Sequence, residues 1–356
     1  MEINFDLLIS GCNTRCKHCY VNGGPGPNIP VEDALLCISR LDELAAALPA
    51  SPVPSFTMDN EPFNHPDIIT IVRAAAAAKH IRYYHHGMTT GIALMNRKDK
   101  ESVVRAYMDC GYHVFGITLH GSPEHHDEIV RRQGAFRASV EAAEYLKSLG
   151  AKISVSLMFN RFFPEDAAVI DQALQQIGPD DGIWFAVPNY TPVPGMRDFE
   201  PYRGSLEDLY ALSDRLEAWG QNRNELLNDA ERHTPAAVLK RFEQGLTVKE
   251  LFMQEQTDLY LTVHQDCRLC MGNTGVETAC LGDLRFLDIR QAAEVISKMP
   301  GNRDYGAFYA LDRLPPQEEI TAALKWLPQH NAYSDTASVI HCALAEAGVP
   351  TRILQR

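Results

Sequence analysis

The sequence has no long apolar run, no positively charged N-terminal segment and no excess of basic residues. Its longest apolar-leaning stretch, residues 68–78, is interrupted by Arg73 and is too short to cross a bilayer. The 33 Lys and Arg residues are outnumbered by 46 Asp and Glu residues, and the net charge of −13 argues against a broad contact with nucleic-acid phosphates. We therefore expect a cytoplasmic protein that binds neither membranes nor nucleic acids.

The sequence also lacks the composition of disordered, collagen-like or coiled-coil proteins, since 45% of its 356 residues are hydrophobic and 22% are charged. Its length suits one large domain with an appendage, or two domains. Nine cysteines are present. Because cytosolic thiols are held reduced, we expect these cysteines to serve as metal ligands or catalytic groups more often than as disulfides.

Apolar runs of strand length alternate with helical periodicity over the first 190 residues. This alternation predicts βα units around a parallel sheet, and six strands in succession suit a TIM-like barrel or partial barrel. In such sheets, ligands bind at the carboxyl ends of the strands. The expected strands are 7–10, 55–58, 81–85, 114–119, 153–159 and 183–187, and the expected helices are 31–48, 67–79, 98–110, 137–149 and 165–177.

The alternation ends at the proline-rich segment 188–195, and we place a domain boundary near residue 200. Residues 1–200 then form the core barrel, and residues 201–356 form a mixed, mainly helical extension that caps the substrate. Within this extension the pattern predicts successive helices over 205–256, strands at 259–263 and 285–287, and helices at 289–298, 318–326 and 337–348.

Three cysteines, Cys12, Cys16 and Cys19, follow the first expected strand in a CxxxCxxC pattern. At the cysteine frequency of this chain, chance produces such a triple roughly 0.006 times. Three thiolates on one tight loop hold three irons of a [4Fe–4S] cube and leave the fourth iron open for another ligand. A structural zinc site, which would need a fourth ligand such as His18, and three unmetallated thiols are the alternatives.

The run CNTRCKHCY from Cys12 to Tyr20 resembles the cluster motif of radical S-adenosylmethionine (radical SAM) enzymes, which often reads CNLRCxHCY. The resemblance covers residues 5–190 and implies an α/β fold, a partial (β/α)6 TIM-like barrel of the radical SAM type. It also implies that Cys12, Cys16 and Cys19 hold a [4Fe–4S] cluster whose open iron chelates SAM. An electron donor such as flavodoxin or ferredoxin is implied as well.

The resemblance extends to later strand ends, where it implies contacts to SAM. Asp59-Asn60-Glu61-Pro62 is similar to the family's Gly-Gly-Glu-Pro, so Glu61 is expected to accept from the SAM ammonium, with a helix N-cap region as the alternative. Asp59 and Asn60 replace both glycines, and such residues adopt unusual backbone angles better than most. The further expected SAM contacts, each weighed against plain loop structure or a solvated charge, are Thr90, Thr118, His120, Arg132, Asn160 and Pro188.

A second group of cysteines, Cys267, Cys270 and Cys280, lies in the C-terminal half. This segment resembles the start of the SPASM or twitch extensions that hold auxiliary iron–sulfur clusters in radical SAM peptide maturases, because Gly275 and Cys280 have that family's spacing. The spacing before Gly275 is shorter than in the family, so the extension is degenerate. A second cluster, a thiol hydrogen donor and simple packing remain open for these three thiols.

These features together predict an oxygen-sensitive radical SAM enzyme, in which reductive cleavage of SAM gives a 5′-deoxyadenosyl radical that abstracts hydrogen from a substrate. The SPASM-like segment favours a ribosomal peptide or an amino-acid-derived metabolite of specialised biosynthesis as the substrate. A step in cofactor or tetrapyrrole biosynthesis is the alternative for an enzyme. A non-enzymatic metal-binding or electron-transfer module would need four cysteine ligands in place of an open iron.

Overall fold

The computed structural model describes residues 2–49, 53–84, 87–193, 195–253, 258–272, 274–275, 277–299 and 314–351. The strands of the N-terminal half are β1 (Glu2–Leu7), β2 (Ser55–Met58), β3 (Arg82–Tyr83), β4 (Met88–Thr89), β5 (Val114–Leu119), β6 (Lys152–Met158) and β7 (Ile183–Ala186). The helices between them are α1 (Val31–Ala47), η1 (Pro62–Asn64), α2 (Ile68–Ala77), α3 (Ile92–Asn96), α4 (Lys100–Asp109), α5 (Pro123–Val130), α6 (Ala135–Ser148) and α7 (Phe163–Ile177).

The C-terminal half adds three strands to the wall and several helices. The strands are β8 (Asp258–Val263), β9 (Arg268–Met271) and β10 (Ala279–Asp283). The helices are η2 (Met196–Tyr202), α8 (Leu206–Ala211), α9 (Ser213–Ala218), α10 (Arg223–Arg232), α11 (Pro235–Glu243), α12 (Val248–Met253), α13 (Ile289–Ser297), α14 (Gln317–Trp326) and α15 (Thr336–Glu346).

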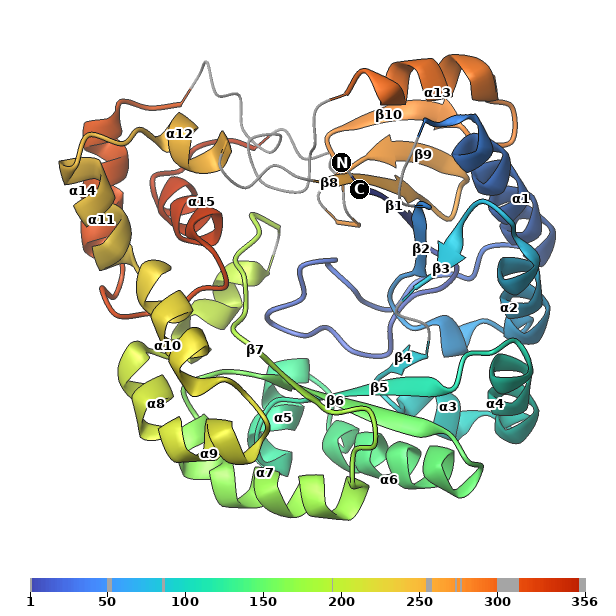
Figure 1. The fold of residues 1–356 in the computed structure, drawn as a ribbon, viewed down its shortest axis with the longest axis horizontal. Helices are drawn as coiled ribbons and strands as arrows, with labels where there is room; N and C mark the ends of the chain where they lie inside the picture. Colours follow the sequence, from blue (N-terminus) through green and yellow to red (C-terminus); the bar gives the residue numbers. More distant parts are fainter. Residues whose placement is uncertain are drawn as a thin grey trace.

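Two sheets form a curved wall with helices along its outer side (Figure 1). The first sheet has the strand order β10-β9-β8-β1-β2-β3, and the second has the order β4-β5-β6-β7. Pairing is parallel from β8 to β3 and again from β4 to β7, and it is antiparallel among β8, β9 and β10. The predicted α/β fold with a partial barrel is therefore confirmed.

Three predicted strands differ from the observed ones. The first strand occupies residues 2–7 instead of 7–10, because buried Ile3, Phe5 and Leu7 alternate with polar side chains in a strand pattern. The predicted third strand, 81–85, is observed only as the short strand β3 at 82–83, residue 85 lies outside the described residues, and an unpredicted short strand, β4, follows at 88–89. The strand predicted at 285–287 is wrong, since the chain makes a turn over residues 284–286 after β10.

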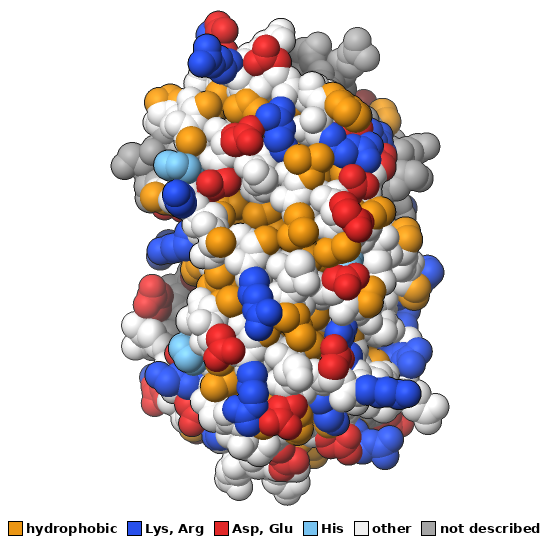
Figure 2. Space-filling view, turned by 90° about the vertical axis from the view of Figure 1, so that its right-hand side faces the viewer, with side chains coloured by type: hydrophobic (Ala, Val, Ile, Leu, Met, Phe, Trp, Pro, Cys, Tyr) orange, Lys and Arg blue, Asp and Glu red, His pale blue; other side chains and the backbone are white. Residues whose placement is uncertain are grey.

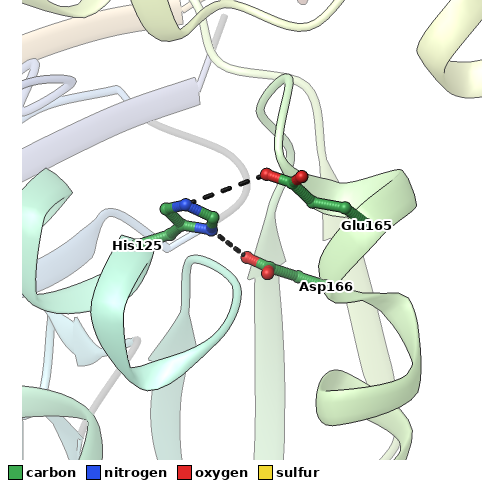
Figure 3. Close-up of side chains that lie close together, drawn as sticks. All are labelled: His125, Glu165 and Asp166. Atoms are coloured by element: carbon green, nitrogen blue, oxygen red, sulfur yellow. Dashed lines mark hydrogen bonds and ion pairs between the residues drawn. The ribbon is translucent and has the colours of Figure 1, made fainter.

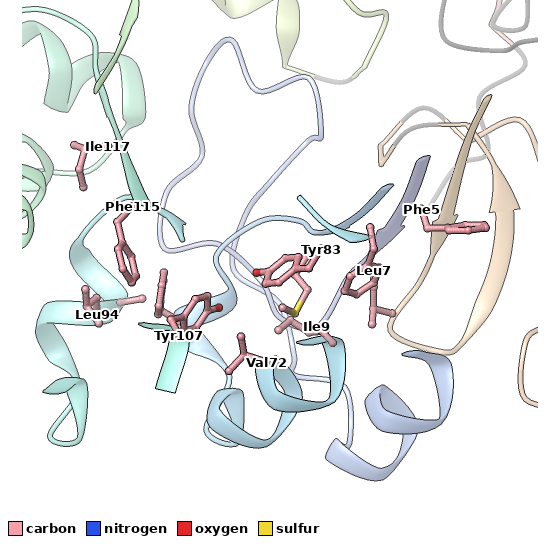
Figure 4. Packing of buried hydrophobic residues seen from close by; sticks show 14 of the residues in the cluster. Phe5, Leu7, Ile9, Val72, Tyr83, Leu94, Tyr107, Phe115 and Ile117 are labelled. Carbon is pink, nitrogen blue, oxygen red and sulfur yellow. The ribbon is translucent and has the colours of Figure 1, made fainter. Parts of the chain in front are cut away.

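The largest hydrophobic core lies between the strands and their outer helices (Figure 4). Tyr107 of α4 packs with its ring centroid 5.3 Å from that of Phe63 and 5.8 Å from that of Phe115 on β5. Fully burying a side chain of this size contributes about 1.5–3 kcal/mol. A second core fills the space among α11, α12, α14 and α15. The helical part of the C-terminal half thus has an apolar interior of its own.

The inner face of the strands is polar. Asp6 of β1 lies in register with Thr57 of β2 and with Thr262 of β8, so these three side chains share one face of the sheet. On β7, Phe185 is buried toward the helices, whereas its neighbour Trp184 is 66% exposed. Polar side chains therefore occupy this face of the first sheet, opposite the buried Phe5 and Leu7.

Arg203, just after η2, joins the barrel to the C-terminal half. Its buried guanidinium donates to the carbonyl oxygens of Pro188 at 2.6 Å and Ala332 at 3.2 Å, and it pairs with the Glu200 carboxylate at 2.8 Å. It also lies 4.0 Å from the centroid of the Tyr333 ring. The planar guanidinium can donate to several acceptors at once. Arg203 therefore connects the segments that contain Pro188, Glu200 and Ala332.

The outer helical face carries both signs of charge. Figure 2 shows Lys and Arg side chains interspersed with Asp and Glu, with apolar side chains between them. None of the described helices combines the length and the apolar character needed to cross a membrane.

Candidate functional site

The loop between β1 and α1 brings Cys12, Cys16 and Cys19 together. The Thr14 hydroxyl lies between two of them, 3.2 Å from Cys12 Sγ and 3.4 Å from Cys16 Sγ. The backbone N–H of Gly23 donates to Cys19 Sγ at 3.1 Å. A Cβ at Gly23 would lie 3.3 Å from Cys19 Sγ and 3.6 Å from Cys12 Cβ, so glycine keeps space open between the thiols. Three converging thiols beside an open space fit a cubic cluster that has one iron without a protein ligand.

Burial governs the protonation of these thiols. It raises the pKa of Cys16 to about 12 and that of Cys19 to about 11, and the charges of the neighbouring thiolates add to the effect. Iron that binds here must therefore displace a proton from each sulfur.

Backbone contacts hold the cluster loop in place. The Cys12 N–H donates to the Gly24 carbonyl at 2.8 Å. Gly11 lies so close to this segment that a Cβ would be 2.1 Å from the Gly26 nitrogen, so no larger residue fits there. The Lys17 N–H donates at 2.9 Å to a carbonyl in the last turn of α5. The loop is thus clamped by a glycine-rich segment on one side and by α5 on the other.

Glu61 follows β2 and is fully buried. Its carboxylate accepts from Thr89 Oγ1 at 2.9 Å, and from the backbone N–H and the hydroxyl of Thr90 at 2.8 Å each. The Ser10 hydroxyl donates to the Glu61 carbonyl at 2.6 Å. Burial raises the pKa of Glu61, while the threonine donors act in the opposite direction. Two residues expected to contact SAM, Glu61 and Thr90, therefore lie in direct contact beside the cluster loop.

Asn60 adopts the left-handed backbone conformation, with φ of +67°. Asparagine tolerates this region better than other residues with a Cβ, so the turn forms without the glycines that the related motif carries. The Asn60 amide donates to the Ser10 carbonyl at 3.4 Å. The turn therefore places Glu61 against the start of the cluster loop.

Three histidines form a chain that runs from the cluster loop to α5. His18 Nε2 lies 2.6 Å from His120 Nε2, and His120 Nδ1 lies 3.4 Å from His126 Nδ1. Burial lowers the pKa of His18 and of His126 to about 4, and lowers that of His120 as well. The rings are therefore neutral near pH 7. His120 is a predicted SAM contact, and His18 is the candidate ligand of the alternative zinc site, whereas His126 is not among the predicted site residues.

Asn160 supports the same chain. Its amide donates to the His120 carbonyl at 2.7 Å, and its Oδ1 accepts from the Phe162 N–H at 3.0 Å. This fully buried side chain fixes the backbone at the ends of β5 and β6. The contacts of Asn160 in the structure are thus structural, and its contact to SAM stays a prediction.

The other expected SAM contacts are more dispersed. Thr118 is half-buried on the inner face of β5. The Pro188 carbonyl already accepts from Arg203, a residue that no sequence pattern singled out. Arg132 is exposed, whereas its neighbour Arg131 borders the cavity beside the cluster loop.

That cavity has a volume of about 550 Å³. It is bordered by two of the cluster cysteines, the glycine-rich segment, the residues that follow β7, and several cationic or amide side chains. Its lining includes Cys16, Cys19, Arg15, Lys17, Asn60, Arg131 and Gln265. Its size and position suit a nucleoside ligand bound against the open side of a cluster.

The C-terminal cysteines do not form one group. Cys270 and Cys280 face each other across β9 and β10 and form a disulfide. The Cys267 thiol instead lies beside the buried Cys37 thiol of α1, and both thiols are free. Because Cys267 lies beside a different cysteine, the described geometry favours two separate cysteine pairs over a common cluster.

A further polar group lies at the start of α5 and α7 (Figure 3). His125 Nδ1 lies 2.8 Å from Asp166 Oδ2, and His125 Nε2 lies 3.8 Å from Glu165 Oε1. The ligand atoms of these three residues are within 4.8 Å of one another. Asp166 also accepts from the Ser122 N–H at 2.8 Å, and the His125 ring stacks on Phe162 at 3.8 Å. These contacts tie α5 to α7.

Comparison with known proteins agrees with this geometry. Residues 7–172 match the model of the Radical SAM superfamily. No curated protein matches the chain in sequence. The fold is similar to that of native anSMEcpe with bound AdoMet, at 13% identity and a TM-score of 0.52 over 83% of this chain and 84% of the other. It is also similar to Streptococcus suis SuiB bound to precursor peptide SuiA, at 14% identity and a TM-score of 0.52 over 84% of this chain and 67% of the other.

The family match covers both the cysteine loop and the Glu61 turn, and the similarity of fold extends beyond it into the C-terminal half. Members of this superfamily are enzymes that use a [4Fe–4S] cluster and SAM, and the three converging thiols and the adjoining cavity fit these two groups. Residues 7–172 are therefore a radical SAM domain.

Proposed function

We propose that this enzyme abstracts hydrogen from a ribosomally made peptide or an amino-acid-derived metabolite. The arrangement of Cys12, Cys16 and Cys19 beside an open cavity carries the proposal. When bound, the cluster supplies the electron that cleaves SAM to methionine and a 5′-deoxyadenosyl radical, and this radical takes the substrate hydrogen.

The residues around the cavity have separate roles in this proposal. Cys12, Cys16 and Cys19 would hold the cluster, and two of them, Cys16 and Cys19, line the cavity. Glu61 would accept from the SAM ammonium, and Thr89 and Thr90 hold its carboxylate by hydrogen bonds. The remaining expected contacts, Thr118, His120, Arg132, Asn160 and Pro188, would surround the rest of SAM, with Arg131 the better placed of the two neighbouring arginines.

The substrate class rests on two observations. The fold is similar over most of its length to that of SuiB, which was solved with a precursor peptide. The cavity adjoins residues 195–196 and Gln265, so the C-terminal half contributes to its wall. A one-electron donor of the flavodoxin or ferredoxin class would supply the electron.

Anaerobic reconstitution tests the proposed chemistry. We expect about four irons per chain and, after reduction with dithionite in the presence of SAM, formation of 5′-deoxyadenosine. Cys12→Ala, Cys16→Ala and Cys19→Ala should each lose the iron and the product. Cys110→Ala is the matched control, because that cysteine lies at the end of α4, away from the loop. If all three loop variants keep both iron and SAM cleavage, the proposal fails.

A further inference from the structure

The charged residues that line the cavity beside the cluster loop all carry positive charge. Among the described residues that border it are three cations, Arg15, Lys17 and Arg131, and no aspartate or glutamate. The chain as a whole has a net charge of −13, so the charge balance around the cavity is opposite to that of the molecule. A cavity whose charged groups share one sign attracts ligands of the other sign.

Two of the three cations already have carboxylate partners. Lys17 Nζ lies 3.3 Å from Glu128 Oε1 and 3.6 Å from the centroid of the Tyr202 ring. Arg131 pairs with Asp198 of η2. The charges of Lys17 and Arg131 are therefore offset by groups of the chain itself.

Arg15 differs from these two cations. Within the part of the chain that the structure describes, its guanidinium forms no ion pair or hydrogen bond. The side chain lies over Gly24, since a Cβ on that glycine would be 3.4 Å from Arg15 Nε and 3.7 Å from Arg15 Cζ. The Arg15 backbone N–H donates at 3.2 Å to the carbonyl of Val130, the residue before Arg131. The cluster loop thus holds a guanidinium with free N–H donors at the wall of the cavity.

The cluster and SAM do not account for this free cation. A [4Fe–4S] cube held by three thiolates is net negative, whereas SAM, with a sulfonium, an ammonium and a carboxylate, is net positive, so the two groups largely offset each other. Arg131 is the arginine better placed to contact SAM. Arg15 is then left with donors for a further ligand.

We propose that Arg15 binds a carboxylate of the substrate. The planar guanidinium directs two parallel N–H groups at the two oxygens of such a partner. Peptides and amino-acid-derived metabolites carry their negative charge as carboxylates, at the chain terminus or on a side chain. The assignment rests on the proposed function and narrows its substrate to one with a free carboxylate, which Arg15 holds next to the cluster loop.

Four small probes test the charge preference on the cluster-loaded, SAM-bound protein. Nα-Acetylnorleucine carries a terminal carboxylate, Nα-acetylglutamic acid α-amide a side-chain carboxylate, Nα-acetylnorleucine amide no charge, and norleucine amide a positive charge. Ligand-observed NMR gives the dissociation constant of each. We expect at least one carboxylate probe to bind about tenfold or more tightly than the neutral probe, and the cation to bind most weakly. The comparison of the two carboxylates shows which source is taken.

Variants then locate the preference. Arg15→Gln should reduce it to about twofold or less, while the iron content and the SAM affinity measured by equilibrium dialysis stay at wild-type values. Arg15→Lys, which keeps the charge without the planar fork, should retain part of it. Arg137→Gln, which removes an exposed charge on α6, should leave it unchanged.

Equal binding of carboxylate and neutral probes to the wild type, no binding by any probe, or a preference that persists in Arg15→Gln would each overturn the assignment. Loss of iron or of SAM affinity in Arg15→Gln would place Arg15 in the cofactor site and would overturn it as well.

Formation of 5′-deoxyadenosine from SAM by the wild type, without any probe, is measured in parallel. Loss of that product would count against the proposed function, whereas intact SAM cleavage with no charge preference would count against the role of Arg15 alone.

Discussion

Thr90 donates both its backbone N–H and its hydroxyl to the same oxygen of Glu61, each at 2.8 Å. Glu61 follows β2 in the first sheet, and Thr90 follows β4 in the second. Since β3 and β4 are not paired with each other, this buried carboxylate is one of the links across the boundary between the sheets. The residue expected to hold SAM thus also contributes to the stability of the barrel.

We predict that Glu61→Gln lowers both stability and SAM affinity. The amide of the new glutamine presents N–H donors to a threonine that is itself a donor, so hydrogen bonds are lost. This loss lowers the free energy of unfolding by about 1–3 kcal/mol. Urea unfolding measures that loss, and equilibrium dialysis with SAM measures the affinity of the reconstituted protein. Glu43→Gln, at an exposed position of α1, is the control. A variant that is destabilised but binds SAM as wild type does would assign Glu61 a purely structural role.

The replacement of glycine by Asn60 gives a second prediction. With φ of +67°, Asn60→Gly should keep or raise stability and preserve SAM binding, because glycine adopts this conformation without a steric penalty. Asn60→Ala should lose about 1–2 kcal/mol, since a Cβ crowds the following carbonyl there. Thermal unfolding of the two variants side by side checks this order. The reverse order would show that the Asn60 side chain, through its amide, matters more than the backbone angle.

The sequence allowed much of the barrel to be predicted, because its helices and strands have clear periodicities. Helix α1, predicted as 31–48, spans Val31–Ala47, and the cluster loop was found from the spacing of Cys12, Cys16 and Cys19. The pairing of β8 with β1 was not predictable, since it joins residues about 256 positions apart without a local signal. Likewise, Cys267 lies beside Cys37 of α1, a neighbour that spacing along the chain cannot indicate.

Arg203 should be among the most sensitive positions outside the cluster site. Arg203→Ala would leave the carbonyls of Pro188, Asn189 and Ala332 without their donor and would leave Glu200 without its buried cation. Removal of one partner of a buried ion pair costs about 3–5 kcal/mol. Urea unfolding measures the loss, and limited proteolysis shows whether the C-terminal half is released from the barrel. Arg105→Ala, which breaks an exposed pair on α4, should cost no more than about 1 kcal/mol.

The neutral histidine chain predicts how stability depends on pH. The pKa of His126 is lowered to about 4 by burial, so below about pH 6.5 the unfolded chain takes up a proton at this position that the folded protein does not. The free energy of unfolding therefore falls as the pH decreases from 6.5 toward 4. Above pH 6.5, His126 contributes no pH dependence to it.

His126→Asn removes this titrating group, and its side-chain oxygen can replace Nδ1 as the acceptor of the His120 N–H. We expect the free energy of unfolding of the cluster-free protein to decline less steeply in the variant than in the wild type between pH 6.5 and 4.5, by the equivalent of up to one bound proton. Above pH 7 the two curves should run parallel, offset by the packing change alone. Urea unfolding at intervals of half a pH unit gives both curves. Parallel curves over the whole range would mean that His126 takes up its proton equally in the folded and unfolded chains, and that the buried histidine chain is not kept neutral by its surroundings.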